Sequence, residues 1–335
     1  MNSQVKRIGV LTSGGDAPGM NAAVRAVVRT ATSRGIECIG IRRGWSGLIN
    51  SDFVKMDSSS VSHIINKGGT LLYTARSKEF MQPEGREKAI ATCKLLGLDA
   101  IVAIGGDGTF RGALALSRQA AESGQHLQVV GVPATIDNDI GCSHYTIGFD
   151  TACNTAVECI DKLRDTMQSH ERCSVVEVMG RHAGYLALYV GISVGATAVL
   201  IPERELDFDR DIVEKIRRAR LAGTTHYMIV VAEGVASAMD IAKRIHDEVG
   251  IDPRVTVLGH IQRGGSPSAR DRETASRMGY EAVKVLAESR GNRIVATQDG
   301  RIVDLDMEEA LQMTKAFNMD RYQVLEAMTN RKNIL

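Results

Sequence analysis

Short apolar runs alternate with glycine-rich turns and with helical patterns along most of the chain. The run RIGVLTS precedes GGDAPG and then MNAAVRAVVRTATSRG, whose apolar residues recur at helical spacing as far as Gly35. The same order recurs in DAIVAI, GGDGT and FRGALALSRQAAESG, although two copies are weak evidence for a repeat. Strands that alternate with helices in this way are typical of βαβ units.

Six further apolar runs also predict strands: ECIGI, LQVVGVP, CSVVEVM, ATAVLIP, HYMIVVAE and RVTVLGH. They are apolar almost throughout, as strands buried on both faces of a parallel sheet are. We therefore expect an α/β protein with two three-layer αβα-type domains and mostly parallel sheets. No low-complexity linker separates the domains, which indicates that the chain crosses between them more than once.

Two other segments need separate interpretation. Residues 182–202 contain no charged side chain over nearly the length of a membrane span, but three glycines and the ending TAVLIP favour a buried helix and then a buried strand. Near the C-terminus, NRIVATQDGRIVDLDM predicts a hairpin around Asp299-Gly300. MEEALQMTKAF and MDRYQVLEAM then predict two surface helices.

Composition narrows the function classes. The 335 residues include 41 Lys+Arg and 40 Asp+Glu, and a net charge of +1 gives no electrostatic reason to expect nucleic acid or a membrane surface as a partner. The six cysteines form no CxxC pair, so we expect free thiols in a reducing cytoplasm. The N-terminal residues lack the apolar core of a signal peptide.

Polar and glycine-rich segments follow six of the predicted strands directly. Open α/β sheets bind ligands at the carboxyl ends of their strands, so these segments together predict one pocket. The segments are residues 14–16, 105–109, 135–139, 179–181, 233–234 and 259–265.

The two GGD segments favour phosphate binding. Glycine lets backbone N–H groups approach an anion closely, and a following helix offers its positive N-terminal end. Asp107 would then hold Mg²⁺. A tight turn whose aspartate caps the helix is an equally good interpretation of either segment alone. The sequence contains no GxxxxGK[ST] motif and no GxGxxG after a strand, which excludes a P-loop and a Rossmann site.

The segment TIDND places two carboxylates, Asp137 and Asp139, two residues apart. Both cannot stay charged in an apolar site without a cation or hydrogen bonds, and one could accept a proton from an alcohol. Alone, the segment fits a solvated turn better, since Asp and Asn are common turn residues.

Basic side chains lie at or near the same segments. Arginine matches the fork geometry of a phosphate, although any single arginine is commonly a solvated surface charge. Because they lie on the same rim of the predicted pocket as the carboxylates and glycines, these side chains together predict phosphoryl transfer to a phosphorylated substrate. They are Arg172, Arg181, Arg254, Arg263 and His260.

Six segments between about residues 7 and 280 resemble, in order, those of the bacterial ATP-dependent 6-phosphofructokinases. They are GVLTSGGDAPGMNAA, IGGDGT, TIDND, YTIGFDTA, VVEVMGRHAGYLA and TVLGHIQRGGSP. The resemblance implies glycolytic transfer of the γ-phosphoryl group of MgATP to the 1-hydroxyl of fructose 6-phosphate, in the cleft between two domains of a cytoplasmic homotetramer. It further implies a larger ATP-binding domain, residues 1–147 and 261–311, and a smaller fructose 6-phosphate-binding domain, residues 148–260 and 312–335.

The resemblance also implies roles for individual residues. Asp137 resembles the general base, and Arg181 the arginine that stabilises the transition state. Thr135 and the backbone of Gly15 assist at the reacting centre. Arg172 and Arg254 reach the sugar phosphate from a neighbouring subunit. The implied ATP-binding residues are Gly15, Arg76, Ser77, Gly106, Asp107, Gly108 and Thr109, with Asp107 also at the metal. The implied substrate-binding residues are Thr135, Asp137, Arg172, Met179, Gly180, Arg181, Glu233, Arg254, His260 and Arg263.

Two positions bear on the phosphoryl donor. Relatives that use pyrophosphate tend to have Asp where this chain has Gly108, and Lys where it has Ala134. A carboxylate at 108 would crowd the α-phosphate, so we expect ATP, with a pyrophosphate-dependent phosphofructokinase as the alternative.

The effector site of the family is only partly matched. Arg25, Arg29 and Arg164 fit its basic residues. Other positions differ, and losing cations should weaken an anion site. We therefore expect activation by ADP and inhibition by phosphoenolpyruvate to be weak, absent or altered. The differing positions are Ser58, Ser59, Thr197, Ala222 and Thr224.

Three other functions compete with this interpretation. GGDGT also occurs in NAD kinase-like and diacylglycerol kinase-like proteins, but the MGR and HIQRGG segments favour a sugar phosphate as acceptor. An inactive subunit is disfavoured because Asp107, Asp137 and Arg181 are all present. A dinucleotide oxidoreductase would need the missing glycine fingerprint.

Overall fold

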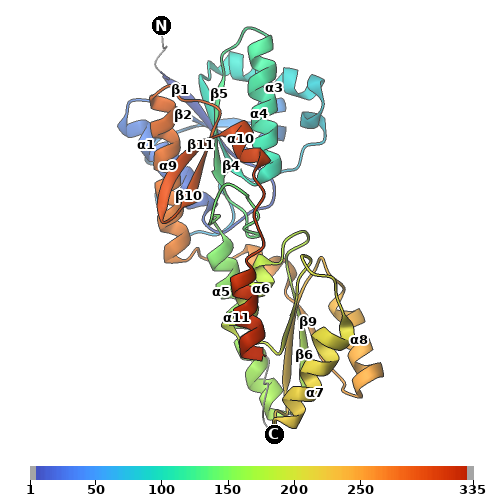
Figure 1. The fold of residues 1–335 in the computed structure, drawn as a ribbon. Coiled ribbons are helices and arrows are strands. Elements are labelled where there is room, and N and C mark those ends of the chain that lie inside the picture. The colour runs from blue at the N-terminus through green and yellow to red at the C-terminus, as the bar shows by residue number, and fades with distance from the viewer. Residues whose placement is uncertain (1–4, 330–335) are drawn as a thin grey trace. The chain divides into compact units, whose positions relative to one another are not determined.

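The computed structural model describes residues 5–329, which fold into two compact units (Figure 1). The first unit contains residues up to 136, 140–151 and 263–315. The second contains residues 137–139, 152–262 and those from 316 onward. The chain therefore passes between the units several times, once within helix α5 (Phe149–Ser169).

A seven-stranded sheet forms the centre of the first unit, in the order β11-β10-β5-β4-β1-β2-β3. The five inner strands pair in parallel, and only the edge strands β3 and β11 are antiparallel to their neighbours. Strand β3 was not expected from the sequence. The strands are β1 (Arg7–Thr12), β2 (Glu37–Ile41), β3 (Phe53–Met56), β4 (Ala100–Gly105), β5 (Gln128–Pro133), β10 (Arg293–Gln298) and β11 (Arg301–Asp306).

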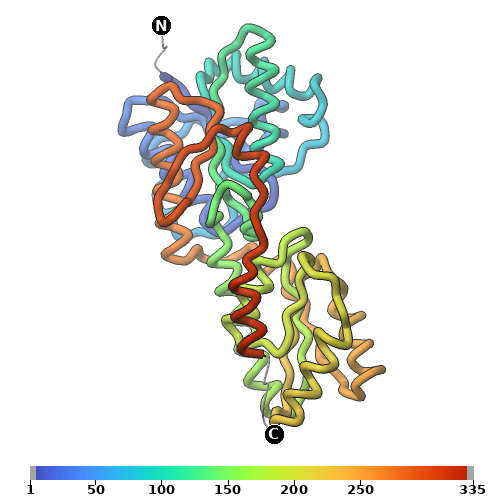
Figure 2. The backbone as a smooth tube through the Cα atoms, viewed as in Figure 1, coloured from blue at the N-terminus to red at the C-terminus, as the bar shows by residue number. Residues whose placement is uncertain are grey.

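Helices cover both faces of this sheet. On one face α1 (Met20–Ser33) packs against α9 (Ala269–Ala287), although the two are far apart in the sequence (Figure 2). The missing side chain of Gly279 allows this close approach, since a Cβ there would lie 2.7 Å from that of Ala26. The other face is covered by α2 (Gly44–Ile49), the short helix η1 (Glu79–Met81), α3 (Pro83–Leu96), α4 (Asp107–Glu122) and α10 (Met307–Gln312).

The second unit contains a four-stranded sheet in the order β7-β8-β6-β9, and all its strand pairs are parallel. The apolar core on one face joins the strands to α8 and to the η2–α7 segment through side chains such as Ile212, Ile216, Ile241 and Ile245. Two mostly parallel sheets with helices confirm the expected α/β class. The elements are β6 (Cys173–Val178), α6 (Tyr185–Ser193), β7 (Ala198–Leu200), the π-helical turn η2 (Asp209–Val213), α7 (Glu214–Leu221), β8 (Tyr227–Ala232), α8 (Ala238–Val249), β9 (Arg254–Val257), η3 (Gly259–Arg263) and α11 (Met319–Thr329).

The uncharged segment 182–202 forms the buried helix α6 and the buried strand β7, as expected. They pack without a gap, because a Cβ at Gly191 would lie 2.2 Å from a methyl carbon of Val199. Among residues 5–329, no helix is both long enough and apolar enough to cross a membrane.

The expected hairpin is confirmed: β10 and β11 pair antiparallel, and both turn residues, Asp299 and Gly300, have positive φ. The first of the two expected C-terminal helices, α10, ends at Gln312 rather than continuing to Phe317. The second, α11, is not purely a surface helix, since Tyr322 and Leu325 are buried.

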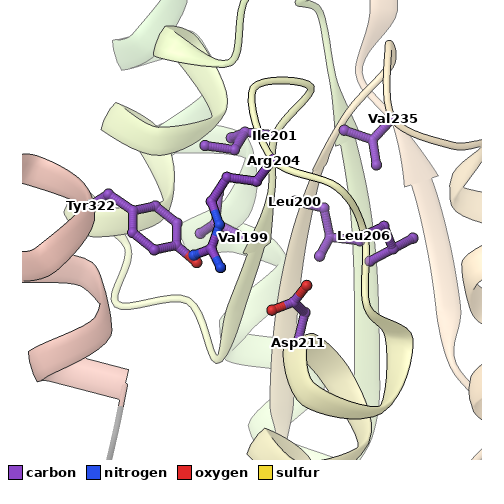
Figure 3. A pocket seen from close by; sticks show the side chains of 8 residues that line it. All are labelled: Val199, Leu200, Ile201, Arg204, Leu206, Asp211, Val235 and Tyr322. Atoms are coloured by element: carbon purple, nitrogen blue, oxygen red, sulfur yellow. The ribbon is translucent and has the colours of Figure 1, made fainter. Parts of the chain in front are cut away.

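A small pocket marks where α11 packs in the second unit (Figure 3). The Arg204 guanidinium lies over the Tyr322 ring, 4.3 Å from its centroid, and Asp211 lines the same pocket. Burial raises the pKa of Tyr322 to about 12, with Glu326 adding to the effect. Lys215 and Glu326 form an ion pair at 2.6 Å beside it, so polar contacts fix this helix as well as apolar ones.

Phe110 on α4 gives a test of the packing in the first unit. It is fully buried, and its ring occupies the space beside Gly131, where a Cβ would lie 2.7 Å from a ring carbon. Phe110→Ala should lower the free energy of unfolding by about 3–5 kcal/mol, because it leaves a cavity. Leu95→Ala is the control: Leu95 is 76% exposed, and a change within about 0.5 kcal/mol is expected. Urea unfolding followed by circular dichroism measures both; a loss below about 1 kcal/mol for Phe110→Ala would contradict the packing.

Candidate active site

The two GGD segments lie side by side at the carboxyl ends of β1 and β4. Parallel pairing places Thr12 opposite Ile104, and the Ser13 N–H donates to the Ile104 carbonyl at 3.0 Å. The buried Thr109 hydroxyl, on the first turn of α4, donates back to the Ser13 carbonyl at 3.1 Å. The two loops are therefore one rigid structure, as their place after neighbouring strands predicts.

Glycine is required where these loops touch. A Cβ at Gly105 would lie 2.5 Å from the Ser13 carbonyl oxygen, and Gly14 has a φ of 91°. By contrast, a Cβ at Gly108 would meet nothing within 4 Å. The N-terminus of α4 thus borders open space on the side of Gly108, where an anion can approach its backbone.

Neither GGD aspartate caps a helix. The N-cap of α4 is Gly106, with Asp107 as the first helical residue, and α1 starts after Gly19 rather than at Asp16. The capping interpretation is therefore wrong for both segments. The Asp107 carboxylate is half-exposed and pairs with Arg111 at 2.6 Å, a surface pair that contributes at most about 1 kcal/mol.

The donor set fits one Mg²⁺ that is shared with a substrate. Among residues 5–329 no group of three or more His, Cys, Asp or Glu side chains gathers to hold a metal. Mg²⁺ commonly takes only one or two protein carboxylates and fills its other positions with water and substrate phosphates. Asp107, beside the open space at Gly108, is suited to this arrangement.

Residues 74–77 border the first glycine loop. The Thr74 hydroxyl donates to the Gly14 carbonyl at 2.7 Å, and this contact places the following Arg76, an exposed side chain, near the loop. The Ser77 hydroxyl accepts from the Phe80 N–H at 3.2 Å, which starts η1. The segment that contains Arg76 and Ser77 therefore contacts the first glycine loop through Thr74.

The residues that lead into Asp137 are held by hydrogen bonds within the first unit. Ala134 donates to the Gly105 carbonyl at 2.9 Å, and the Thr135 carbonyl accepts from the Thr146 hydroxyl at 2.6 Å. Asn138 is buried and adopts a left-handed conformation, which reverses the chain. Asp137 is half-buried, so the segment is not a fully solvated turn.

Three polar segments meet at the carboxyl edge of the four-stranded sheet. The Glu233 N–H donates to the Val178 carbonyl at 2.9 Å, and the Arg181 guanidinium lies 3.9 Å from the Glu233 carboxylate. Arg181 is 74% exposed, so its guanidinium faces solvent beside that carboxylate. A Cβ at Gly234 would lie 2.0 Å from the Arg181 carbonyl oxygen, which requires glycine there.

Gln262 fixes the third segment and had no role in the sequence analysis. Its carboxamide oxygen accepts from the Met179 N–H at 2.8 Å in a fully buried position. This bond holds η3, with the exposed His260, against the Met179–Gly180 turn, where Gly180 has a φ of 134°. A glutamine inside a polar loop has no local signal that distinguishes it from a solvated one.

Arg263, the last residue of η3, contacts the first glycine loop within the first unit. Its guanidinium donates to the Asp16 carbonyl at 3.1 Å. A Cβ at Gly15 would lie 2.6 Å from the same guanidinium nitrogen. A predicted sugar-phosphate residue and a predicted ATP-binding loop are therefore adjacent.

Arg172 and Arg254 do not lie on that edge, and the expectation that all five basic residues share one rim is wrong within one chain. Arg172 precedes β6 and Arg254 begins β9, and the parallel register pairs Ser174 with Arg254. Both arginines are therefore at the amino ends of their strands, opposite the end that leads to Arg181. Arg254 is exposed and pairs with Asp252 at 3.3 Å.

The three effector-type arginines are divided between the units. Arg25 and Arg29 line a pocket of the first unit together with Ser62, His63, Ile65, Asn66 and Lys67. Arg164 lines a pocket of the second unit with Thr197, Thr224 and the end of α11.

All six cysteines are free thiols, as expected, and five of them are buried. Burial raises the pKa of the Cys38 and Cys93 thiols to about 12, so neither is a nucleophile at neutral pH.

Comparison with known proteins agrees with this geometry. A family model described as phosphofructokinase matches residues 7–286. ATP-dependent 6-phosphofructokinase 1 of Clostridium perfringens (strain 13 / Type A) is 52% identical over 324 residues, which cover 97% of this chain and 99% of that protein. ATP-dependent 6-phosphofructokinase of Clostridium botulinum (strain Hall) is 50% identical over 320 residues, 96% of this chain and 98% of that protein.

Solved structures share the fold. Phosphofructokinase from Saccharomyces cerevisiae superposes with a TM-score of 0.90 at 34% identity; the match covers 97% of this chain and half, 50%, of that longer chain. Pyrophosphate-dependent phosphofructokinase from Marinobacter aquaeolei has a TM-score of 0.84 at 20% identity, over 98% of this chain and 93% of that one, a likeness of fold alone. With a family model over most of its length and relatives half identical to it from end to end, the chain belongs to the phosphofructokinase family.

Proposed function

We propose that the chain is an ATP-dependent 6-phosphofructokinase, which transfers the γ-phosphoryl group of MgATP to the 1-hydroxyl of fructose 6-phosphate in glycolysis. The main observation in support is the contact of Arg263 with the Gly15 loop, because it brings a phosphate-binding cation next to a glycine loop suited to ATP. The half-identical Clostridium perfringens relative, named an ATP-dependent 6-phosphofructokinase, agrees with this assignment.

The chain's own residues account for each part of the reaction. The backbone of Gly15 and of residues 106–109 binds the ATP phosphates, with Arg76 and Ser77 beside them. Asp107 would hold Mg²⁺, which supplies positive charge to the β- and γ-phosphates when bound. Met179, Gly180, Glu233, His260 and Arg263 bind the sugar phosphate.

Asp137 is the proposed general base. Its carboxylate accepts the proton of the 1-hydroxyl, the freed oxygen bonds to the γ-phosphorus, and the bond from that phosphorus to the β,γ-bridging oxygen breaks to release ADP. Thr135 stands two residues before it and binds the sugar. Arg181, an exposed cation at the carboxyl edge of its sheet, stabilises the charge that spreads over the transferring group.

Arg172 and Arg254 are proposed to act on a neighbouring subunit of a homotetramer. Their position at the amino ends of β6 and β9 supports this, because it directs them away from the edge that holds Arg181 in their own chain. Free, buried thiols agree with a cytoplasmic location.

A coupled assay for fructose 1,6-bisphosphate tests the function and the donor together. With fructose 6-phosphate, Mg²⁺ and ATP we expect turnover of about 1–100 s⁻¹, the usual range of kinases. With pyrophosphate instead of ATP we expect none, because the chain has Gly108 and Ala134 where relatives that use pyrophosphate tend to have Asp and Lys. Turnover with pyrophosphate alone would reverse the donor assignment, and no product from either donor would refute the function.

Removing the general base gives a second prediction. Asp137→Ser should lower kcat by about 10²–10⁴-fold, because serine has no carboxylate to accept the proton. Affinity for both substrates should stay within several-fold. Asp240→Ser, at an exposed position on α8, is the matched control and should retain wild-type turnover. Asp137 is not the base if its serine variant retains more than about a tenth of kcat.

Regulation by anions is proposed to be weak or altered. Where the family has a metal-binding glutamate, the Thr197 hydroxyl accepts from the Met228 N–H at 3.1 Å and extends the pairing of β7 with β8. Arg164 donates to the Val194 carbonyl, so its charge is partly engaged within the chain.

Steady-state kinetics checks this proposal. Addition of phosphoenolpyruvate should change the half-saturating concentration of fructose 6-phosphate by less than about threefold, since an anion site that lacks its cations binds weakly. ADP should act only as a product inhibitor. A clear sigmoidal response to phosphoenolpyruvate would show that the remaining arginines suffice.

A further inference from the structure

One buried carboxylate of the first unit has no part in the mechanism above. Asp271, on the first turn of α9, is fully buried at 0% exposure. One carboxylate oxygen accepts from the Tyr145 hydroxyl and from the Gly148 N–H at 2.7 Å. The other accepts from the Thr151 N–H at 2.9 Å and from the Thr151 hydroxyl. We call Asp271, Tyr145, Gly148 and Thr151 the Asp271 cluster.

The donors of the cluster require a side chain at position 271 whose two terminal atoms both accept hydrogen bonds. Each oxygen faces one backbone N–H, from Gly148 or Thr151, and a backbone N–H cannot accept a hydrogen bond. An asparagine in place of Asp271 would direct its NH₂ group at one of these donors in either orientation. The asparagine side chain is nearly isosteric with aspartate, so the substitution tests the hydrogen bonds rather than the packing.

The cluster binds residues 145–148, the segment by which the chain returns after Asp137. The chain enters the TIDND segment through Ala134 and Thr135 and returns through residues 145–148. The two arms are bound to each other, since Ala134 pairs with Ile147 and the Thr146 hydroxyl donates to the Thr135 carbonyl at 2.6 Å. The returning arm is bound in turn to Asp271, more than 120 residues later in the chain.

The same cluster holds the end of the loop that contains Arg263. The Ser268 N–H donates to the Thr151 hydroxyl at 2.9 Å, and the Ser268 hydroxyl caps α9 by accepting from the Asp271 N–H at 3.2 Å. Arg272 donates to the Pro267 carbonyl at 2.7 Å. Two loops with proposed roles in the reaction therefore share one buried anchor.

We propose that Asp271 is a positioning residue for phosphoryl transfer: by accepting four hydrogen bonds it fixes, within the first unit, the segments that lead into and out of residues 137–139 and the loop that starts at Arg263. This inference rests on the proposed function. A displacement of about 1 Å at a reacting group can cost on the order of 10²-fold in rate.

The test counts active sites and turnover separately in the full chain. For Asp271→Asn, isothermal titration with MgADP should give the wild-type number of sites and a Kd within about threefold, because the glycine loops are held by contacts outside the cluster. The kcat per titrated site should fall by about 10–10²-fold, as expected for a misplaced reacting group. Glu273→Gln is the matched control: it makes the same carboxylate-to-amide change on α9, but at an exposed side chain, and should retain turnover.

A merely structural role predicts a different result. It would lower the melting temperature or the number of ADP sites and leave kcat per site within twofold of wild type, and that outcome overturns the proposal. If Asp271→Asn does not fold, Tyr145→Phe decides the question, since it removes one donor and keeps the ring. A threefold to tenfold fall in kcat per site supports the proposal, and an unchanged value overturns it. Wild-type protein that makes no fructose 1,6-bisphosphate would refute the proposed function itself, before any variant is compared.

Discussion

The parallel pairing of β1 with β4 is the interaction on which the site depends. Because parallel strands end at the same edge of a sheet, Thr12 and Ile104 bring the segments that follow them together. The Ser13 N–H and carbonyl then bond to the β4–α4 region, at Ile104 and Thr109. A shift of one residue in this register would turn every side chain of the strand to the other face and separate the two glycine loops.

The features that the sequence predicts are those with a local physical cause. Strands buried on both faces must be apolar throughout, so runs such as AIVAIG and YMIVVA indicate their own structure. The Asp299-Gly300 turn is identifiable because its residues tolerate positive φ. The parallel strands explain why the polar segments lie together, since segments that follow adjacent parallel strands meet at the same edge of the sheet.

The features that could not be predicted depend on contacts between distant residues. Asp271 bonds to residues 120 to 126 positions earlier, and no spacing rule identifies such a partner. The same holds for Gln262, whose partner Met179 is 83 positions away. Arg172 and Arg254 illustrate the converse error: each is close in sequence to a strand of the site, but at the amino end, which only the strand boundaries and register reveal.

The side chain of Thr197 contributes to the pairing of β7 with β8. A glutamate there would have to leave the Met228 N–H without its present acceptor, whereas the threonine hydroxyl completes the β7–β8 pairing. A threonine at this position thus adds a side-chain hydrogen bond to the sheet, which agrees with the proposal that the effector site is altered.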